Sequence, residues 1–96
     1  MLKYLKEHIV DEINDAMDYM TKALEHKGTA DGCTFYELGM AELEHANRLT
    51  HIFKNTERPA EMTDAEYGEV QKEVLNKFVD SMGKIESMKK LYHKSY

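Results

Sequence analysis

Helix-breaking and cross-linking residues are scarce in this chain. Its 96 residues include one proline, one cysteine, no tryptophan and five glycines. Proline-rich linkers and an all-β fold are therefore excluded, and the composition is typical of a helical globular protein. A lone cysteine, Cys33, cannot form an internal disulfide, so we expect the reducing cytoplasm as the setting. The length suits one domain, residues 1–96.

Positive charge is also in short supply. Thirteen Lys and Arg face eighteen Asp and Glu, which leaves a net charge of -5. Nucleic acid and anionic membranes demand the opposite excess, so neither is an expected partner, whereas an acidic surface suits metal cations. Long hydrophobic runs are missing as well: charged residues interrupt positions 1–15, which excludes a signal-peptide core or a membrane span there. We expect a soluble protein.

Apolar periodicity predicts an all-α fold of three helices, over about 2–27, 30–55 and 63–95. Gly28 and its polar neighbours form the first turn, and Thr63 with Glu66 forms a capping box before the third helix. The second helix begins between Thr29 and Thr34, because Thr34 with Glu37 also reads as a capping box. Its buried face is expected to contain Phe35, Leu38, Ala41, Leu49, Ile52 and Phe53.

The third helix exceeds the first two in length by about 10 Å at 1.5 Å per residue. The first two helices form an antiparallel hairpin, which covers less apolar surface than this long element presents. We therefore expect the far end of the third helix to pack on another copy of the chain, and the protein to associate.

Three polar residues interrupt the stripes that should be apolar. Glu12 lies at the helical step between apolar neighbours, and Glu42 and His45 follow the same rule on the expected inner face of the second helix. Residues equidistant from the turn of an antiparallel hairpin lie side by side. The midpoint between Glu12 and Glu42 is Lys27, and that between Glu12 and His45 falls between Gly28 and Thr29. All three donors should therefore meet at one height, where a first-row metal such as Fe, Mn or Zn accepts oxygen and nitrogen ligands.

The Glu42-Leu43-Glu44-His45 stretch contains a Glu-x-x-His motif, and with Glu12 it resembles the ferritin-like di-iron carboxylate proteins. Tyr19, seven residues after Glu12, matches a tyrosine often found on that face in the family. The chain carries half of the family's ligand set, so it is most similar to the short encapsulated-ferritin type. The resemblance covers about residues 5–53.

Several expectations follow from this resemblance. It implies a four-helix ferritin-like bundle completed by dimerisation, with a di-iron centre shared between two chains. It implies metal ligation by Glu12, Glu42 and His45 and a catalytic role for these residues and Tyr19. Mn or Zn are substitutes for Fe. The partners are a second copy, in a homodimer or higher homo-oligomer, and an encapsulin-type shell that would place the protein in a nanocompartment.

The function implied is a ferroxidase that oxidises Fe(II) to Fe(III) with dioxygen, for iron storage or detoxification. One alternative is a rubrerythrin-like protein that reduces peroxide at the same ligands. Another is a non-catalytic helical assembly module in which Glu and His only set the helix register, since a single Glu-x-x-His is a weak motif. Tyr19 has an alternative reading as a core residue. We expect the remaining histidines, His8, His26, His51 and His93, to lie at the surface.

Overall fold

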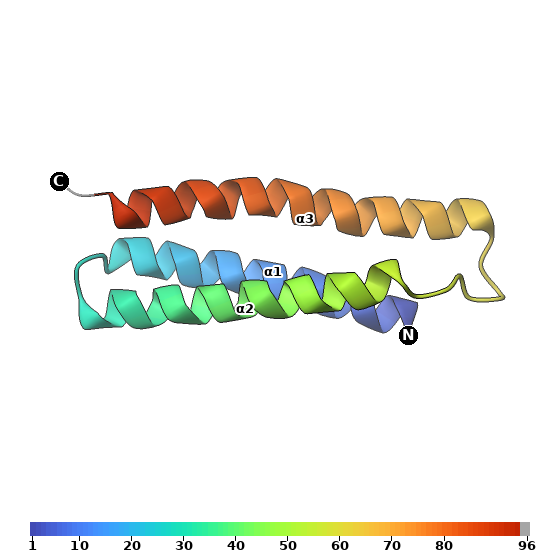
Figure 1. The fold of residues 1–96 in the computed structure, drawn as a ribbon, viewed down its shortest axis with the longest axis horizontal. Coiled ribbons are helices and arrows are strands. Elements are labelled where there is room, and N and C mark those ends of the chain that lie inside the picture. Colours follow the sequence, from blue (N-terminus) through green and yellow to red (C-terminus); the bar gives the residue numbers. More distant parts are fainter. Residues whose placement is uncertain (95–96) are drawn as a thin grey trace.

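The computed structural model describes residues 1–94 and contains three helices, with no strand in that range. Helix α1 spans Leu2–Glu25, α2 spans Ala30–Lys54 and α3 spans Asp64–His93. The first two form an antiparallel hairpin, and α3 runs back along it as a longer element (Figure 1). The all-α class with three helices is confirmed. Within residues 1–94, no helix combines the length and apolar character that crossing a bilayer requires.

Local turn chemistry explains the hairpin connection. Gly28 adopts a φ of 86°, the left-handed conformation that glycine reaches without a Cβ clash. Thr29 then caps α2, because its side-chain oxygen accepts a hydrogen bond from the backbone N–H of Gly32 at 3.0 Å. Of the two starting points that the sequence allows, Thr29 is thus the cap, whereas the hydroxyl of Thr34 donates back to the carbonyl of Ala30 inside the helix.

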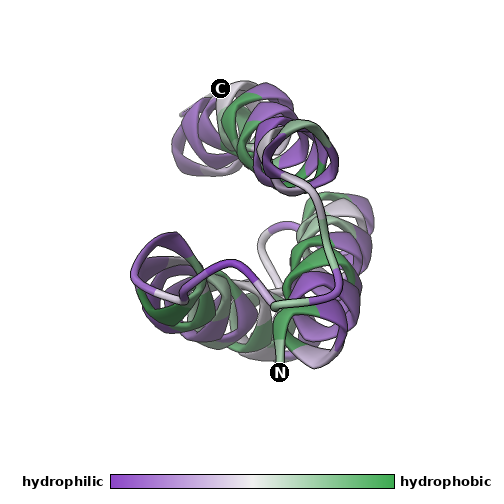
Figure 2. Ribbon diagram, turned by 90° about the vertical axis from the view of Figure 1, so that its right-hand side faces the viewer, coloured by the Kyte–Doolittle hydropathy of each residue, from purple (hydrophilic) through white to green (hydrophobic). Residues whose placement is uncertain are grey.

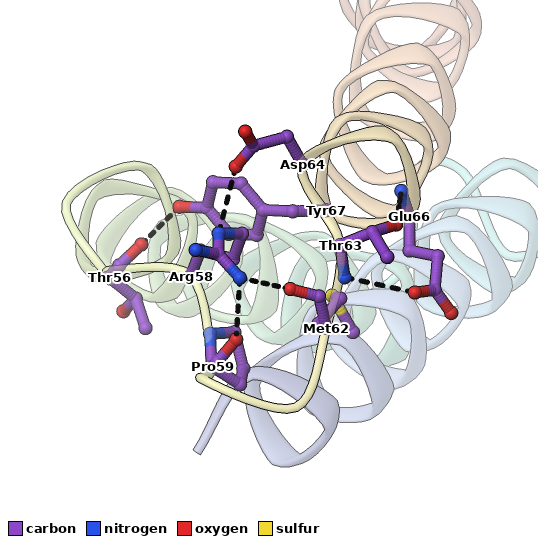
Figure 3. Close-up of polar contacts among 8 residues, drawn as sticks. All are labelled: Thr56, Arg58, Pro59, Met62, Thr63, Asp64, Glu66 and Tyr67. Carbon is purple, nitrogen blue, oxygen red and sulfur yellow. Dashed lines mark hydrogen bonds and ion pairs between the residues drawn. The ribbon is translucent and has the colours of Figure 1, made fainter.

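Polar contacts hold the connection between α2 and α3 in one conformation (Figure 3). The Tyr67 hydroxyl, from the first turn of α3, donates to the carbonyl of Thr56, just after α2. Arg58 forms an ion pair with Asp64 at 2.8 Å and also donates to two loop carbonyls. These contacts link the end of α2 to the beginning of α3 and so set the direction in which α3 returns.

The expected capping box at the start of α3 is confirmed. The backbone N–H of Glu66 donates to the Thr63 hydroxyl at 3.1 Å, and the backbone N–H of Thr63 donates to the Glu66 carboxylate at 2.9 Å. These bonds, the one from the Thr63 backbone first, hold the pKa of Glu66 below its ordinary value of 4.5. The Glu66 carboxylate therefore contributes to the cap in its charged form.

Helix α1 is the centre of the packing. It contacts α2 along its length and α3 on another side, and the three helices form an open arc when viewed end on (Figure 2). The core follows the predicted stripe of α1, with contributions from the other two helices. Its buried apolar members are Leu2, Leu5, Ile9, Ile13, Ala16, Met20, Ala23, Leu43, Ala46, Phe53, Val74 and Ile85.

The expected buried face of α2 is wrong for Leu38 and Ile52, whereas Phe35, Ala41 and Leu49 are half-buried. Leu38 and Ile52 are 40% and 49% exposed, and of the expected set only Phe53 is fully buried. The face against α1 instead contains Gly32, Gly39, Leu43, Ala46, Thr50 and Phe53. Small residues allow the two backbones to approach closely: a Cβ on Gly39 would lie 3.1 Å from the Met20 sulfur. Close packing through this face, which we call the small-residue stripe, leaves Leu38 and Ile52 turned away from α1.

The far end of α3 contacts the hairpin turn of its own chain. Its expected packing on another copy stays a prediction. The Lys27 ammonium, in the hairpin turn, donates to the carbonyls of Leu91 and Lys94 at 2.7 and 2.6 Å. Tyr36 of α2 lies 2.9 Å from the His93 ring nitrogen and stacks on Tyr92. Partial burial there raises the pKa of the Tyr92 hydroxyl. The last turn of α3 is thereby attached to the hairpin turn.

Candidate metal centre

Helices α1 and α2 bring Glu12, Glu42 and His45 together, as their equal distance from the turn predicts. Each offers one ligand atom, and the three atoms lie within 4.8 Å of one another. Within residues 1–94 no other group of three His, Cys, Asp or Glu side chains is placed in this way. Glu42 and His45 are three residues apart on α2 and therefore share one side of it, facing Glu12 from α1.

The Glu12 carboxylate is partly buried, with one of its oxygens closed off from solvent. Its side chain is 23% exposed, and its Oε2 atom is buried with no hydrogen-bond partner in residues 1–94. The Nδ1 atom of His45 is 3.6 Å from this oxygen, beyond hydrogen-bond distance. A buried carboxylate oxygen without a donor is unfavourable in a protein, and a bound cation is one of the groups that can compensate it.

The His45 side chain does not lie on an inner face, as its stripe predicts, but is 55% exposed. Glu42 is half-buried. The reason is the orientation of α2 described above, because the small-residue stripe occupies the contact with α1. Glu12 and Glu42 are therefore half-buried, whereas His45 lies at the surface.

This group lies on the side of the hairpin away from α3. Tyr36 of α2 contacts the end of α3. His45 follows Tyr36 by nine residues, two and a half helical turns, which places the two on opposite sides of α2. Helix α3 therefore leaves the donor group uncovered, next to the exposed side chains of Leu38 and Ile52.

Tyr19 is half-buried on α1, two turns beyond Glu12, and lies outside the three-donor group. Its ring stacks on Phe35 of α2, with ring centroids 6.4 Å apart. Its catalytic role stays a prediction. The histidines expected at the surface, His8, His26, His51 and His93, are all exposed. His8, one turn before Glu12, packs its ring at a tilt against Tyr4 and lies outside the donor group.

Sequence reasoning missed the exposed apolar residues beside the donor group. Leu38 and Ile52 are exposed, although the sequence pattern assigns them to the buried face, and their stripe contains both Glu42 and His45. That mixture was the available signal, because a stripe with two ionisable residues at its centre is a poor candidate for the closed core of a hairpin.

Two carboxylates and one imidazole can bind a divalent first-row ion. Ligand atoms around one such ion lie about 3 to 4 Å apart, so small side-chain rotations would close the observed group on a cation. The donors therefore fit a metal in number and chemistry. In the comparisons with known proteins, no family model, no curated protein and no solved structure matches this chain.

Proposed function

We propose that the chain binds Fe(II) through Glu12, Glu42 and His45 and, paired with a second copy, oxidises it to Fe(III) with dioxygen. The observation that carries the proposal is the convergence of three ligand atoms within 4.8 Å from two different helices. The proposed role is iron storage or detoxification. The resemblance of these residues to the ferritin-like di-iron carboxylate proteins supports the choice of iron.

Burial supports a cation over a simple Glu and His pair. An ion pair between Glu12 and His45 would place the charged atoms in hydrogen-bond contact, whereas Oε2 and Nδ1 are 3.6 Å apart. The Oε2 atom meanwhile is buried without a donor from residues 1–94. A divalent ion between the three donors would satisfy this oxygen and would neutralise the charges of Glu12 and Glu42.

A second copy completes the proposed centre. Three donors from one chain leave coordination positions open, and the exposed His45 edge is accessible to another molecule. A two-fold axis beside this edge would bring together four carboxylates and two imidazoles. The four negative charges of these carboxylates balance two divalent ions, so the paired centre carries no large net charge.

The proposed reaction is a one-electron oxidation of each Fe(II), and dioxygen accepts the electrons. Two electrons and two protons convert one dioxygen molecule into hydrogen peroxide. Glu12 and Glu42 would favour the product state, because anionic oxygen donors stabilise Fe(III) more than Fe(II). Tyr19 belongs to the proposal as a residue two turns from Glu12 whose removal should alter oxidation more than binding.

Glu42→Ala tests this function, with Glu44→Ala as the matched control. Glu44 lies on the same helix, is exposed and forms an ion pair with Arg48 one turn away. Fe(II) is added in air and the absorbance of Fe(III) is followed, after anaerobic calorimetry with Fe(II) has measured binding. We expect Glu42→Ala to lose both signals and Glu44→Ala to keep them.

Full oxidation by Glu42→Ala would overturn the proposal. Turnover with hydrogen peroxide is measured beside turnover with dioxygen, because a strong preference for peroxide would favour the rubrerythrin-like reaction. Equilibrium dialysis that shows no bound Fe, Mn or Zn would favour the assembly module.

A further inference from the structure

Helix α2 carries two apolar stripes, and the second is only partly covered within the chain: Phe35 and Leu49 are half-buried, whereas Leu38 and Ile52 are exposed. The small-residue stripe packs on α1. The second stripe, which we call the outer stripe, has the alternating spacing of three and four residues that is typical of a coiled-coil seam. Its six members are Phe35, Leu38, Glu42, His45, Leu49 and Ile52. Two of its leucine and isoleucine side chains remain 40% and 49% exposed, so the outer stripe has surface left to bury.

The outer stripe is symmetric about its centre. Positions 35 and 52, 38 and 49, and 42 and 45 all share one midpoint, which lies between residues 43 and 44. Two apolar residues therefore flank each side of a central Glu42 and His45. When two identical helices run in opposite directions about this midpoint, each apolar residue of the stripe lies level with an apolar residue of the other helix. Each Glu42 then lies level with a His45.

We infer that α2 pairs with α2 of a second copy in an antiparallel seam centred between residues 43 and 44. In this register Leu38 lies level with the partner's Leu49, and Phe35 lies level with the partner's Ile52. Glu42 lies level with the partner's His45, so each copy supplies a donor beside the other copy's donors. The inference deepens the proposed function and rests on it for the role of Glu42 and His45 as ligands.

Charge selects this direction over a parallel one. A parallel two-fold pairing would place the Glu42 carboxylate against its own copy and His45 against its own copy, which repels like groups. The antiparallel register places an acid beside an imidazole at both ends of the centre. The outer flank of the stripe, formed by Thr34, Ala41, Arg48 and Asn55, contains no pair of like charges that would oppose the contact.

The symmetry of the stripe also selects a second copy over an unrelated partner. A different protein would gain nothing from residues that match about a midpoint, whereas a two-fold dimer requires a self-complementary surface. The open position of the stripe agrees with this choice, because α3 packs near Tyr36 on the opposite side of α2. A second hairpin can therefore approach without displacing any helix of the first.

Cysteine cross-linking tests the register. Leu38→Cys and Leu49→Cys are prepared as separate proteins in a Cys33→Ser background, because Cys33 is exposed. The two are mixed and oxidised with diamide, which avoids adding copper to a metal-binding protein. We expect a covalent dimer in the mixture and none in either protein alone. In the proposed register, Leu38 is about 16 Å along the axis from its own copy, too far for a disulfide.

Two results would overturn the register. A covalent dimer from Leu38→Cys alone would indicate a parallel seam, and the lack of one in the mixture would exclude the antiparallel pairing. Sedimentation of chains without introduced cysteines gives an independent measurement. Ile52→Ser should weaken the dimer roughly 100-fold, since each dimer loses the side chain twice. Val79→Ser, at a 68% exposed position on α3, should leave the dimer unchanged. Equal dimerisation of the two variants would count against the seam.

The outcomes for the seam and for the proposed function are separable. Cross-linking is measured with EDTA and again with Zn²⁺, and neither measurement depends on iron oxidation. A cross-linked mixture that does not oxidise Fe(II) would keep the seam and reject the ferroxidase. Oxidation of Fe(II) by a protein that fails the cross-linking test would keep the function and reject the register.

Discussion

Replacing Glu12 by methionine should stabilise the protein without metal and remove its response to metal. The Glu12→Met side chain has a similar length but no oxygen that requires a donor. In the native chain the Oε2 atom is buried without a hydrogen-bond partner in residues 1–94. The same atom is one of the three that would hold a cation. Stability and binding should therefore change in opposite directions.

The magnitude follows from the surroundings of Glu12. A buried polar atom that lacks a partner costs about 1 to 3 kcal/mol. The 3.6 Å contact with the half-exposed His45 returns at most about 1 kcal/mol. We therefore expect Glu12→Met to raise the free energy of unfolding by about 1 kcal/mol in EDTA. For a domain of this size, that change raises Tm by about 4 to 8 °C.

Thermal unfolding followed by far-ultraviolet circular dichroism, in EDTA and with Zn²⁺, measures both effects. A ligand present at 100 times its Kd stabilises the native state by about 2.7 kcal/mol, so Zn²⁺ should raise the Tm of the native chain clearly. Glu12→Met should show no such rise. Glu44→Met is the control, because Glu44 is exposed and its change should stay within about 0.5 kcal/mol.

Either of two results would refute this reasoning. A lower Tm for Glu12→Met in EDTA would mean that the buried oxygen is compensated in the native protein. An undiminished response of Glu12→Met to Zn²⁺ would mean that Glu12 is not a ligand.

Glycine and the capping box give further predictions. A Cβ at Gly32 would lie 2.2 Å from a backbone oxygen of the hairpin turn, so Gly32→Ala should destabilise the fold by about 1 to 3 kcal/mol. Gly68, on α3, has open space around it, and Gly68→Ala should stabilise by about 0.5 to 1 kcal/mol; urea unfolding measures both. The lowered pKa of Glu66 means that its contribution is present above the ordinary value of 4.5 and is lost as the pH falls through the lowered pKa. Unfolding of Glu66→Gln should therefore depend less on pH in the acid range, and equal acid dependence of both proteins would contradict the assignment.

The parts of the fold that the sequence predicts well are those set by local chemistry. Gly28 and Thr63 act through their own backbone and their near neighbours, so the turn and the capping box could be placed without knowledge of the tertiary structure. The height of Glu12, Glu42 and His45 is also a local consequence, because it depends only on distance from a turn.

The orientation of α2 could not be predicted in the same way. Large apolar residues such as Leu38 and Ile52 favour burial in any pattern analysis, and glycine contributes nothing to an apolar stripe. In the structure the helices approach through Gly32 and Gly39, because close backbone contact brings many atoms together without large side chains. The attachment of the end of α3 to the hairpin turn could not be predicted either. Lys27, which attaches its end, is a polar turn residue with no periodic signal.

Because of the orientation of α2, the proposed metal binding and the proposed dimerisation should be thermodynamically coupled. The outer stripe contains Glu42 and His45 but not Glu12, so the surface proposed to bind iron and the surface proposed to bind a second copy overlap. If an ion binds the pair more tightly than the single chain, the pair must form more readily with the ion by the same factor. Metal-free protein should then dissociate at concentrations where metal-loaded protein is dimeric. Sedimentation across a dilution series, with EDTA and with Zn²⁺, measures this factor, and identical dissociation in both conditions would mean that the site and the seam are independent.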